Sequence, residues 1–166
     1  MKEPEEIIEA LAMALIADEV EDVDVLGALS PAQDGERKLS PDTYIAVFCD
    51  QGGQRYYGDD TVIPCDYSLR VTVHVANADD KSGSLFRDVC RAVRGVLEYV
   101  RMNHCEALTA EGFTCSAFRM DNTQTEPDSS ADNGGIAKTY SATVTGLYDP
   151  PQDDEEEETT TETQGE

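Results

Sequence analysis

The chain opens with a helical pattern. Over residues 5–17 the aliphatic side chains recur every three or four positions, so they collect on one face of a helix, and the acidic side chains collect on the opposite face. The aliphatic set is Ile7, Ile8, Leu11, Ala14 and Leu15, and the acidic set is Glu5, Glu6 and Glu9. Pro4 suits the first helical turn. A helix that is apolar on one side only needs a partner to cover that side.

Period-two patterns predict the strands. Residues 65–75 alternate most regularly, with Tyr67 to Val75 placing apolar side chains on one side and polar ones, including His74, on the other. Residues 44–50 are almost continuously apolar, which predicts a strand buried on both faces or nearly so. Further strands are expected at residues 23–26, 55–57, 113–120 and 136–148.

A second one-sided helix is predicted at residues 85–102, with Ser82 or Ser84 as its N-cap. Its apolar face consists of Leu85, Phe86, Val89, Val93, Val96, Leu97 and Val100. The opposite face carries four arginines, namely Arg87, Arg91, Arg94 and Arg101.

These elements predict one α+β domain over residues 1–148. Two helices would pack on one face of a mostly antiparallel sheet of four to five strands. Segments 18–42 and 121–135 are polar and are expected to be largely loop, the second as a long hairpin tip. Residues 149–166 carry nine acidic and no basic side chains, and we expect a disordered acidic tail because they cannot bury enough apolar surface.

Composition narrows the function classes. The 166 residues carry a net charge of −23, which argues against broad binding to nucleic acids or anionic membranes. No stretch approaches the apolar length of a membrane span, so we expect a soluble protein without a membrane partner. The acidic N-terminal residues 1–6 have the wrong sign for a secretory signal, so we expect no export by that route.

Candidate catalytic groups are sparse. The five cysteines are odd in number and contain no CxxC pair, and we expect reduced thiols in a cytosol. His74 and His104 are interpreted as exposed or helix-terminal side chains, and no glycine loop has phosphate-binding spacing. We therefore predict no catalytic residue, no cofactor and no enzyme activity. The alternative from another class is a small cytosolic enzyme or metal protein that uses His104, Cys105 and Cys115, although their spacing matches no zinc signature.

The arginines of the second helix leave three interpretations open. They are a solvated face, a contact for an acidic surface, or, against the net charge, a nucleic-acid contact. In a ring of identical copies, the arginines of one subunit would meet the carboxylates of the next. Arg55, Tyr56 and Tyr57 form a second candidate contact surface, because aromatic and arginine side chains are common interface anchors.

The order of these segments resembles a known family. A helix of Ile, Leu and Ala precedes the strand at residues 41–47, the alternating strand at 67–75, an amphipathic helix and the closing strand at 137–148. Over residues 5–148 this layout is similar to the tail terminator, or tail completion, proteins of long-tailed bacteriophages and to related head-tail joining proteins.

The resemblance implies a two-layer fold and a hexameric ring that caps the tail tube, stops its elongation and presents a surface to the head-tail connector proteins. It implies the virion tail as location, with the host cytoplasm during assembly, and brings no catalytic residue or metal. DNA would pass through the ring without being bound specifically, since an acidic lumen would repel phosphate. Another neck component, such as a stopper, is the nearest alternative.

Overall fold

The structure is a computed structural model that describes residues 2–28, 41–51, 64–129, 131 and 133–149. Its elements, in chain order, are α1 (Pro4–Glu19), β1 (Asp24–Gly27), β2 (Tyr44–Gln51), β3 (Cys65–Ala76), α2 (Ser84–Arg101), the short 3-10 helix η1 (Cys105–Leu108), β4 (Phe113–Pro127) and β5 (Gly135–Tyr148). The five strands form one sheet in the order β1-β2-β3-β5-β4. β1 and β2 are parallel and the other neighbouring strands are antiparallel. The predicted α+β class, with a mostly antiparallel sheet, is confirmed.

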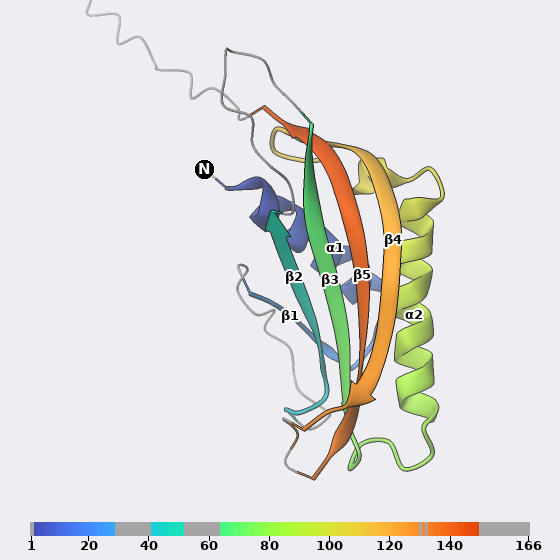
Figure 1. The fold of residues 1–166 in the computed structure, drawn as a ribbon. Helices are drawn as coiled ribbons and strands as arrows, with labels where there is room; N and C mark the ends of the chain where they lie inside the picture. The colour runs from blue at the N-terminus through green and yellow to red at the C-terminus, as the bar shows by residue number, and fades with distance from the viewer. Residues whose placement is uncertain (1, 29–40, 52–63, 130, 132, 150–166) are drawn as a thin grey trace, which may run out of the picture.

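Both helices cover the same face of the sheet, the face turned away from the viewer in Figure 1. α1 packs on β1 and β2, and α2 packs beside it on β3, β4 and β5. Val71, Val73 and Val93 are fully buried between the two layers. The other face carries polar side chains, such as Thr72 and Thr139, whose hydroxyl oxygens lie 3.0 Å apart. No helix in the described part is both long and apolar enough to cross a membrane.

β2 is completely buried on one face and only half-buried on the other, so the prediction of burial on both faces, or nearly so, holds in full for one face only. Ile45, Val47 and Cys49 point into the core, whereas Tyr44 and Phe48 on the other face are half-buried. Side chains of the neighbouring strand β3 cover these two rings. The guanidinium of Arg70 lies 5.0 Å from the centroid of the Phe48 ring, and the ring of His74 stacks on Tyr44 at 4.4 Å.

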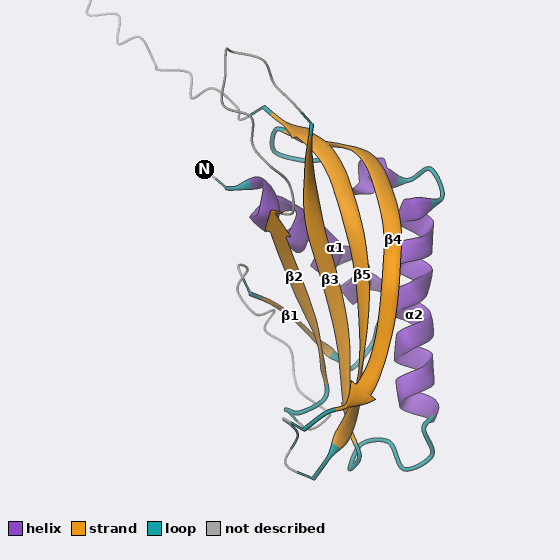
Figure 2. Cartoon of the chain, viewed as in Figure 1, coloured by secondary structure: helices purple, strands orange, loops and turns teal. Residues whose placement is uncertain are grey.

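The hairpin of β4 and β5 is longer than the sequence predicts (Figure 2). β4 continues to Pro127 and β5 begins at Gly135, so about half of the expected loop at 121–135 is strand. Residues 121–127 are exposed on an edge strand, where backbone pairing with β5 needs no apolar side chains. The period-two pattern that marks a half-buried strand is therefore missing from this segment.

The buried face of α1 differs from the predicted one. Ala14 is exposed, and Glu9 is completely buried although the sequence pattern placed it on the outer face. The Glu9 carboxylate accepts a hydrogen bond of 3.4 Å from the backbone N–H of Cys49, beyond the last residue of β2 that pairs with β1. Gly27 makes this approach possible, because a Cβ at that position would lie 2.3 Å from Glu9 Oε1.

α2 begins without the expected serine cap. Its N-cap is Gly83, with a φ of 75°, and the Asp80 carboxylate accepts hydrogen bonds from the N–H groups of Leu85 and Phe86 at 3.2 and 2.8 Å. The hydroxyl groups of Ser82 and Ser84 lie 2.9 Å from each other. The prediction of a serine N-cap is therefore wrong, because Asp80, upstream of both serines, accepts the hydrogen bonds of the first turn.

Replacing Asp80 by alanine is expected to lower the free energy of unfolding by about 1–2 kcal/mol. Two N–H groups of the first turn lose their acceptor, and the positive end of the helix loses a negative charge. Ser82→Ala is the matched control and should change stability by less than about 0.5 kcal/mol. Urea unfolding followed by circular dichroism measures both variants, and equal losses would contradict the role given to Asp80.

Candidate interaction surface

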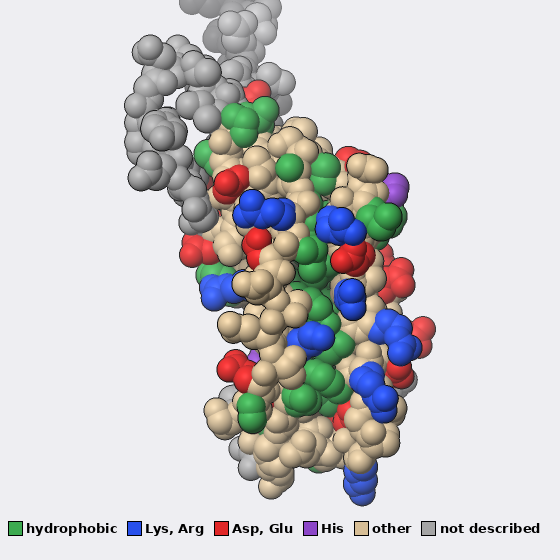
Figure 3. Space-filling view, turned by 45° about the vertical axis from the view of Figure 1, so that its right-hand side comes forward, with side chains coloured by type: hydrophobic (Ala, Val, Ile, Leu, Met, Phe, Trp, Pro, Cys, Tyr) green, Lys and Arg blue, Asp and Glu red, His purple; other side chains and the backbone are tan. Residues whose placement is uncertain are grey.

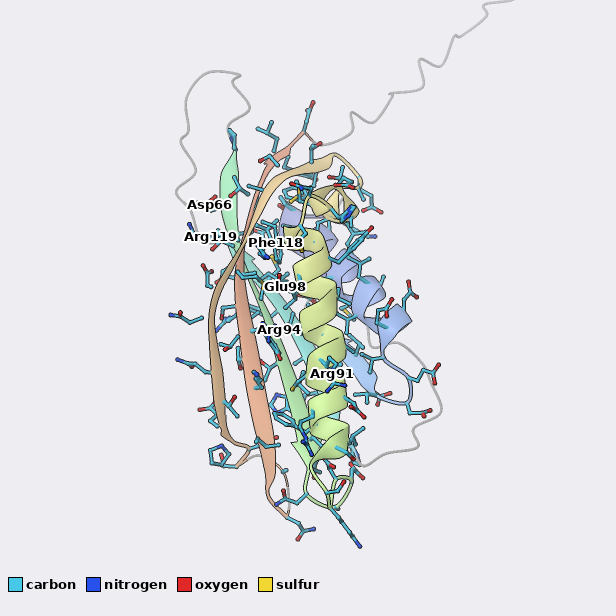
Figure 4. All side chains as sticks on the ribbon, turned by 90° about the vertical axis from the view of Figure 1, so that its right-hand side faces the viewer. Asp66, Arg91, Arg94, Glu98, Phe118 and Arg119 are labelled. Carbon is cyan, nitrogen blue, oxygen red and sulfur yellow. The ribbon has the colours of Figure 1, made fainter. Side chains whose placement is uncertain are left out.

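All four arginines of α2 are exposed, as a solvated face or a contact surface requires. The seven-residue spacing of Arg87, Arg94 and Arg101 puts these three on one line along the helix. In Figure 4, Arg94 lies on the side of α2 that faces β4, and Arg91 lies further round on the outer surface of the helix. The predicted arginine face is therefore a row beside the sheet edge, with Arg91 next to it.

The arginines differ in their partners. Arg101 forms an ion pair of 2.8 Å with Glu98, and Arg87 donates a hydrogen bond of 3.3 Å to the carbonyl oxygen of Gly83. Arg91 lies 3.6 Å from Asp88. Arg94 takes part in no hydrogen bond or ion pair among the residues that the structure describes, so its guanidinium is available to a partner.

An apolar strip runs beside the arginine row, between α2 and the sheet edge (Figure 3). Phe118 and Met120 of β4 are half-buried there. Tyr140 of β5 donates a hydrogen bond of 3.2 Å to the carbonyl oxygen of Cys90, and Lys138 Nζ lies 5.3 Å from the centroid of the Tyr140 ring. The basic flank is the name used here for this surface, which comprises Arg87, Arg94, Arg101, Phe118, Met120 and Lys138.

The opposite flank of α2 borders a groove of about 670 Å³ between α1 and α2. Its apolar lining consists of Leu15, Ala92, Gly95, Val96 and Tyr99. Tyr99 is 52% exposed, which is unusual for a large aromatic side chain. A Cβ at Gly95 would meet no atom within 4 Å, so the groove is open at its middle. The rim is formed by Asp18, Glu19, Asp88 and Arg91, and this feature is called the acidic groove below.

The carboxylates that α1 contributes to the acidic groove destabilise this helix. Asp18 and Glu19 lie in the last turn of α1, which has no basic residue, and the negative end of the helix dipole disfavours carboxylates there by about 0.3–1 kcal/mol each. Arg91 offsets little of this charge, because its ion pair with Asp88 joins side chains that are 80% and 70% exposed. The groove therefore combines an apolar floor with an uncompensated negative rim.

The three residues of the alternative metal site, His104, Cys105 and Cys115, are only partly brought together. Cys105 Sγ lies 3.6 Å from the carbonyl oxygen of Cys115, so these two residues are neighbours. The ring of His104 instead stacks on Tyr99 at 4.2 Å, and its Nδ1 lies 3.4 Å from a carboxylate oxygen of Glu106. Within the described ranges, no group of three or more histidine, cysteine or acidic side chains could hold a metal ion.

His74 is not the exposed side chain that the sequence suggests. Its Nδ1 lies 2.9 Å from Asp128 Oδ2, with both side chains largely buried, so the pair ties β3 to the turn that follows β4. No hydroxyl or thiol group of the described residues hydrogen-bonds to this ring. Sequence reasoning missed this pair because 54 residues separate its members.

The buried thiols are poor nucleophiles. Burial, reinforced by nearby carboxylates, raises the pKa of Cys49, and burial also raises the pKa of Cys90. Burial and the neighbouring Cys105 raise the pKa of Cys115 to about 12. Because the thiolate is the reactive form, these three cysteines stay protonated and unreactive near neutral pH.

The same shifts predict a loss of stability in base. Above the ordinary thiol pKa of 9.0 the unfolded chain releases protons that the folded chain retains, so the free energy of unfolding falls as the pH rises, for Cys115 up to about pH 12. Each such group contributes a slope of about 1.4 kcal/mol per pH unit. Urea unfolding at pH 8 and pH 10 measures it. Cys115→Ala should show a shallower fall than the natural chain, and equal slopes would refute the assignment.

The second predicted contact surface, Arg55, Tyr56 and Tyr57, lies outside the described residues, as do the strand expected there and all of the acidic tail beyond Asp149. Among the predicted contact residues, the structure thus places only the four arginines of α2. No model of a known protein family matches the chain, and no curated protein matches it in sequence.

Proposed function

We propose that this chain is a tail terminator of a phage or prophage, a structural protein that caps the tail tube as a hexameric ring. The ring ends tube elongation and presents the surface to which the head-side connector proteins join. The order of the elements along the chain suggests this family. The observation that carries the proposal is the basic flank, an exposed row of cations beside partly exposed apolar side chains on a strongly acidic protein.

The basic flank suits self-assembly for an electrostatic reason. A net charge of −23 makes two copies repel each other over most orientations. Concentrated cations on one flank make one orientation favourable, since they can face the carboxylates of a neighbour. A contact between two different surfaces repeats from copy to copy and closes into a ring when the rotation between copies allows it.

Two measurements on the full chain test this function. Native mass spectrometry should detect a species near six times 18.1 kDa. Co-expression with the tail-tube protein encoded in the same genome should give tubes of uniform length with a ring at one end in electron micrographs. A chain that stays monomeric and leaves tube length unchanged would overturn the proposal. Capture of portal-side proteins without binding to tubes would favour a stopper instead.

Replacing Arg94 and Arg101 by glutamate is expected to weaken self-association by about ten-fold or more while the fold is retained. Both side chains are exposed, so the substitutions disturb no core packing. The control Lys2→Glu with Lys81→Glu has the same change in net charge at exposed positions outside the basic flank. Sedimentation velocity measures association, and circular dichroism measures folding. Unchanged assembly of the first variant would show that these arginines form a solvated face and not a contact surface.

A further inference from the structure

We propose that the acidic groove of one copy receives the basic flank of a second copy of this chain. This inference rests on the proposed ring and names the two surfaces that join its subunits. The two surfaces lie on opposite flanks of one helix, α2, and carry opposite charges.

The shapes of the two surfaces are compatible. The groove runs between α1 and α2, and its lining at Ala92 and Gly95 offers little side-chain bulk. A row of side chains on one helix packs into a groove of this kind when helices associate. Arg87, Arg94 and Arg101 form such a row along an 18-residue helix of about 27 Å, with Phe118 next to it to cover the exposed ring of Tyr99.

The charges of the two surfaces are complementary. Arg94 has no ion-pair partner within the described part of its own chain, and Asp18 and Glu19 line the groove in the last turn of a helix without a cation. The Arg94 guanidinium of a neighbouring copy would find ion-pair partners in the groove, and it would offset the negative charge of Asp18 and Glu19. Two basic flanks facing each other would repel, as would two acidic grooves, so the contact runs from head to tail around a ring.

The unfavourable position of the groove carboxylates provides an independent argument. A cation in the last turn of α1 would stabilise the isolated helix, yet Asp18 and Glu19 are found there. Departures from local rules of this kind are typical of functional surfaces. The neutral variant Asp18→Asn with Glu19→Gln should therefore raise the melting temperature of the isolated chain and weaken its self-association. A purely structural role for the two carboxylates would lower the melting temperature instead.

The decisive experiment reverses the charges of each surface in turn. The first variant carries Arg87→Glu and Arg94→Glu, and the second carries Asp18→Lys and Glu19→Lys. All four positions are exposed, so both variants are expected to fold, and circular dichroism checks this. Each variant alone should self-associate about ten-fold more weakly than the natural chain in sedimentation velocity. An equimolar mixture should assemble again, since each reversed surface then meets its complement.

The outcomes separate this inference from the proposed function. Restored assembly of the mixture, with masses above that of a dimer, supports the pairing. If the natural chain forms a ring and the mixture does not, the pairing is wrong and the terminator function stands. If the natural chain remains monomeric both alone and with tail tubes, the proposed function and this inference are overturned together.

Discussion

Replacing Phe113 by alanine is expected to lower the free energy of unfolding by about 3–5 kcal/mol. The ring is 1% exposed and meets Tyr67 edge-on, with the ring centroids 5.6 Å apart. It also lies against Gly146 of β5, where a Cβ would be 2.4 Å from Phe113 Cζ. Because the neighbouring strand leaves this space for the ring, the smaller side chain would leave a cavity that the surroundings cannot easily fill.

Phe118→Ala is the matched control for this prediction, since the same residue type lies five positions further along β4. Its ring is half-buried beside α2, so the loss of stability should be about 1 kcal/mol or less. Self-association should suffer more than stability, because Phe118 belongs to the basic flank. Urea unfolding measures both variants, and comparable losses at the two positions would show that the site of Phe113 is not specially formed for its ring.

Replacing Glu9 by alanine is expected to cost about 2–4 kcal/mol. The change removes buried methylene groups and leaves the N–H of Cys49 without the carboxylate that accepts its hydrogen bond. Glu9→Gln keeps the shape and one acceptor oxygen, so it should cost less. Amide hydrogen exchange at Cys49 gives an independent reading and should become faster in Glu9→Ala than in Glu9→Gln. Slow exchange with unchanged stability in Glu9→Ala would disprove this role.

The sequence predicts helices and strands correctly where a periodic pattern of apolar residues runs through the element itself. The alternation from Tyr67 to Val75 fixes which side chains of β3 enter the core, and all five apolar members of that series are buried. The short strand expected at residues 23–26 is confirmed as β1, and the helix expected at 85–102 is confirmed within one residue at each end. A repeating pattern over many residues outweighs the preference of any single position.

The same reasoning fails where a partner distant in sequence decides the outcome. Glu9 is buried because the end of β1 exposes the N–H of Cys49, 40 residues away. Residues 121–127 form a strand because they pair with β5. Asp80 caps α2, although the local sequence favoured Ser82 or Ser84 as the cap. None of these contacts produces a periodic pattern in the sequence.

The sequence by itself determined the class of this protein: two one-sided helices, a mostly antiparallel sheet, and a row of arginines along the second helix. Helical spacing sets that row locally, so no tertiary contact was needed to find it. Only the tertiary structure decided what lies on either side. Packing α1 beside α2 creates the acidic groove, and packing α2 on the sheet brings β4, with Phe118, to the side of the helix that carries Arg94. These neighbours come from segments far apart along the chain, and packing energy, which depends on the whole fold, brings them together.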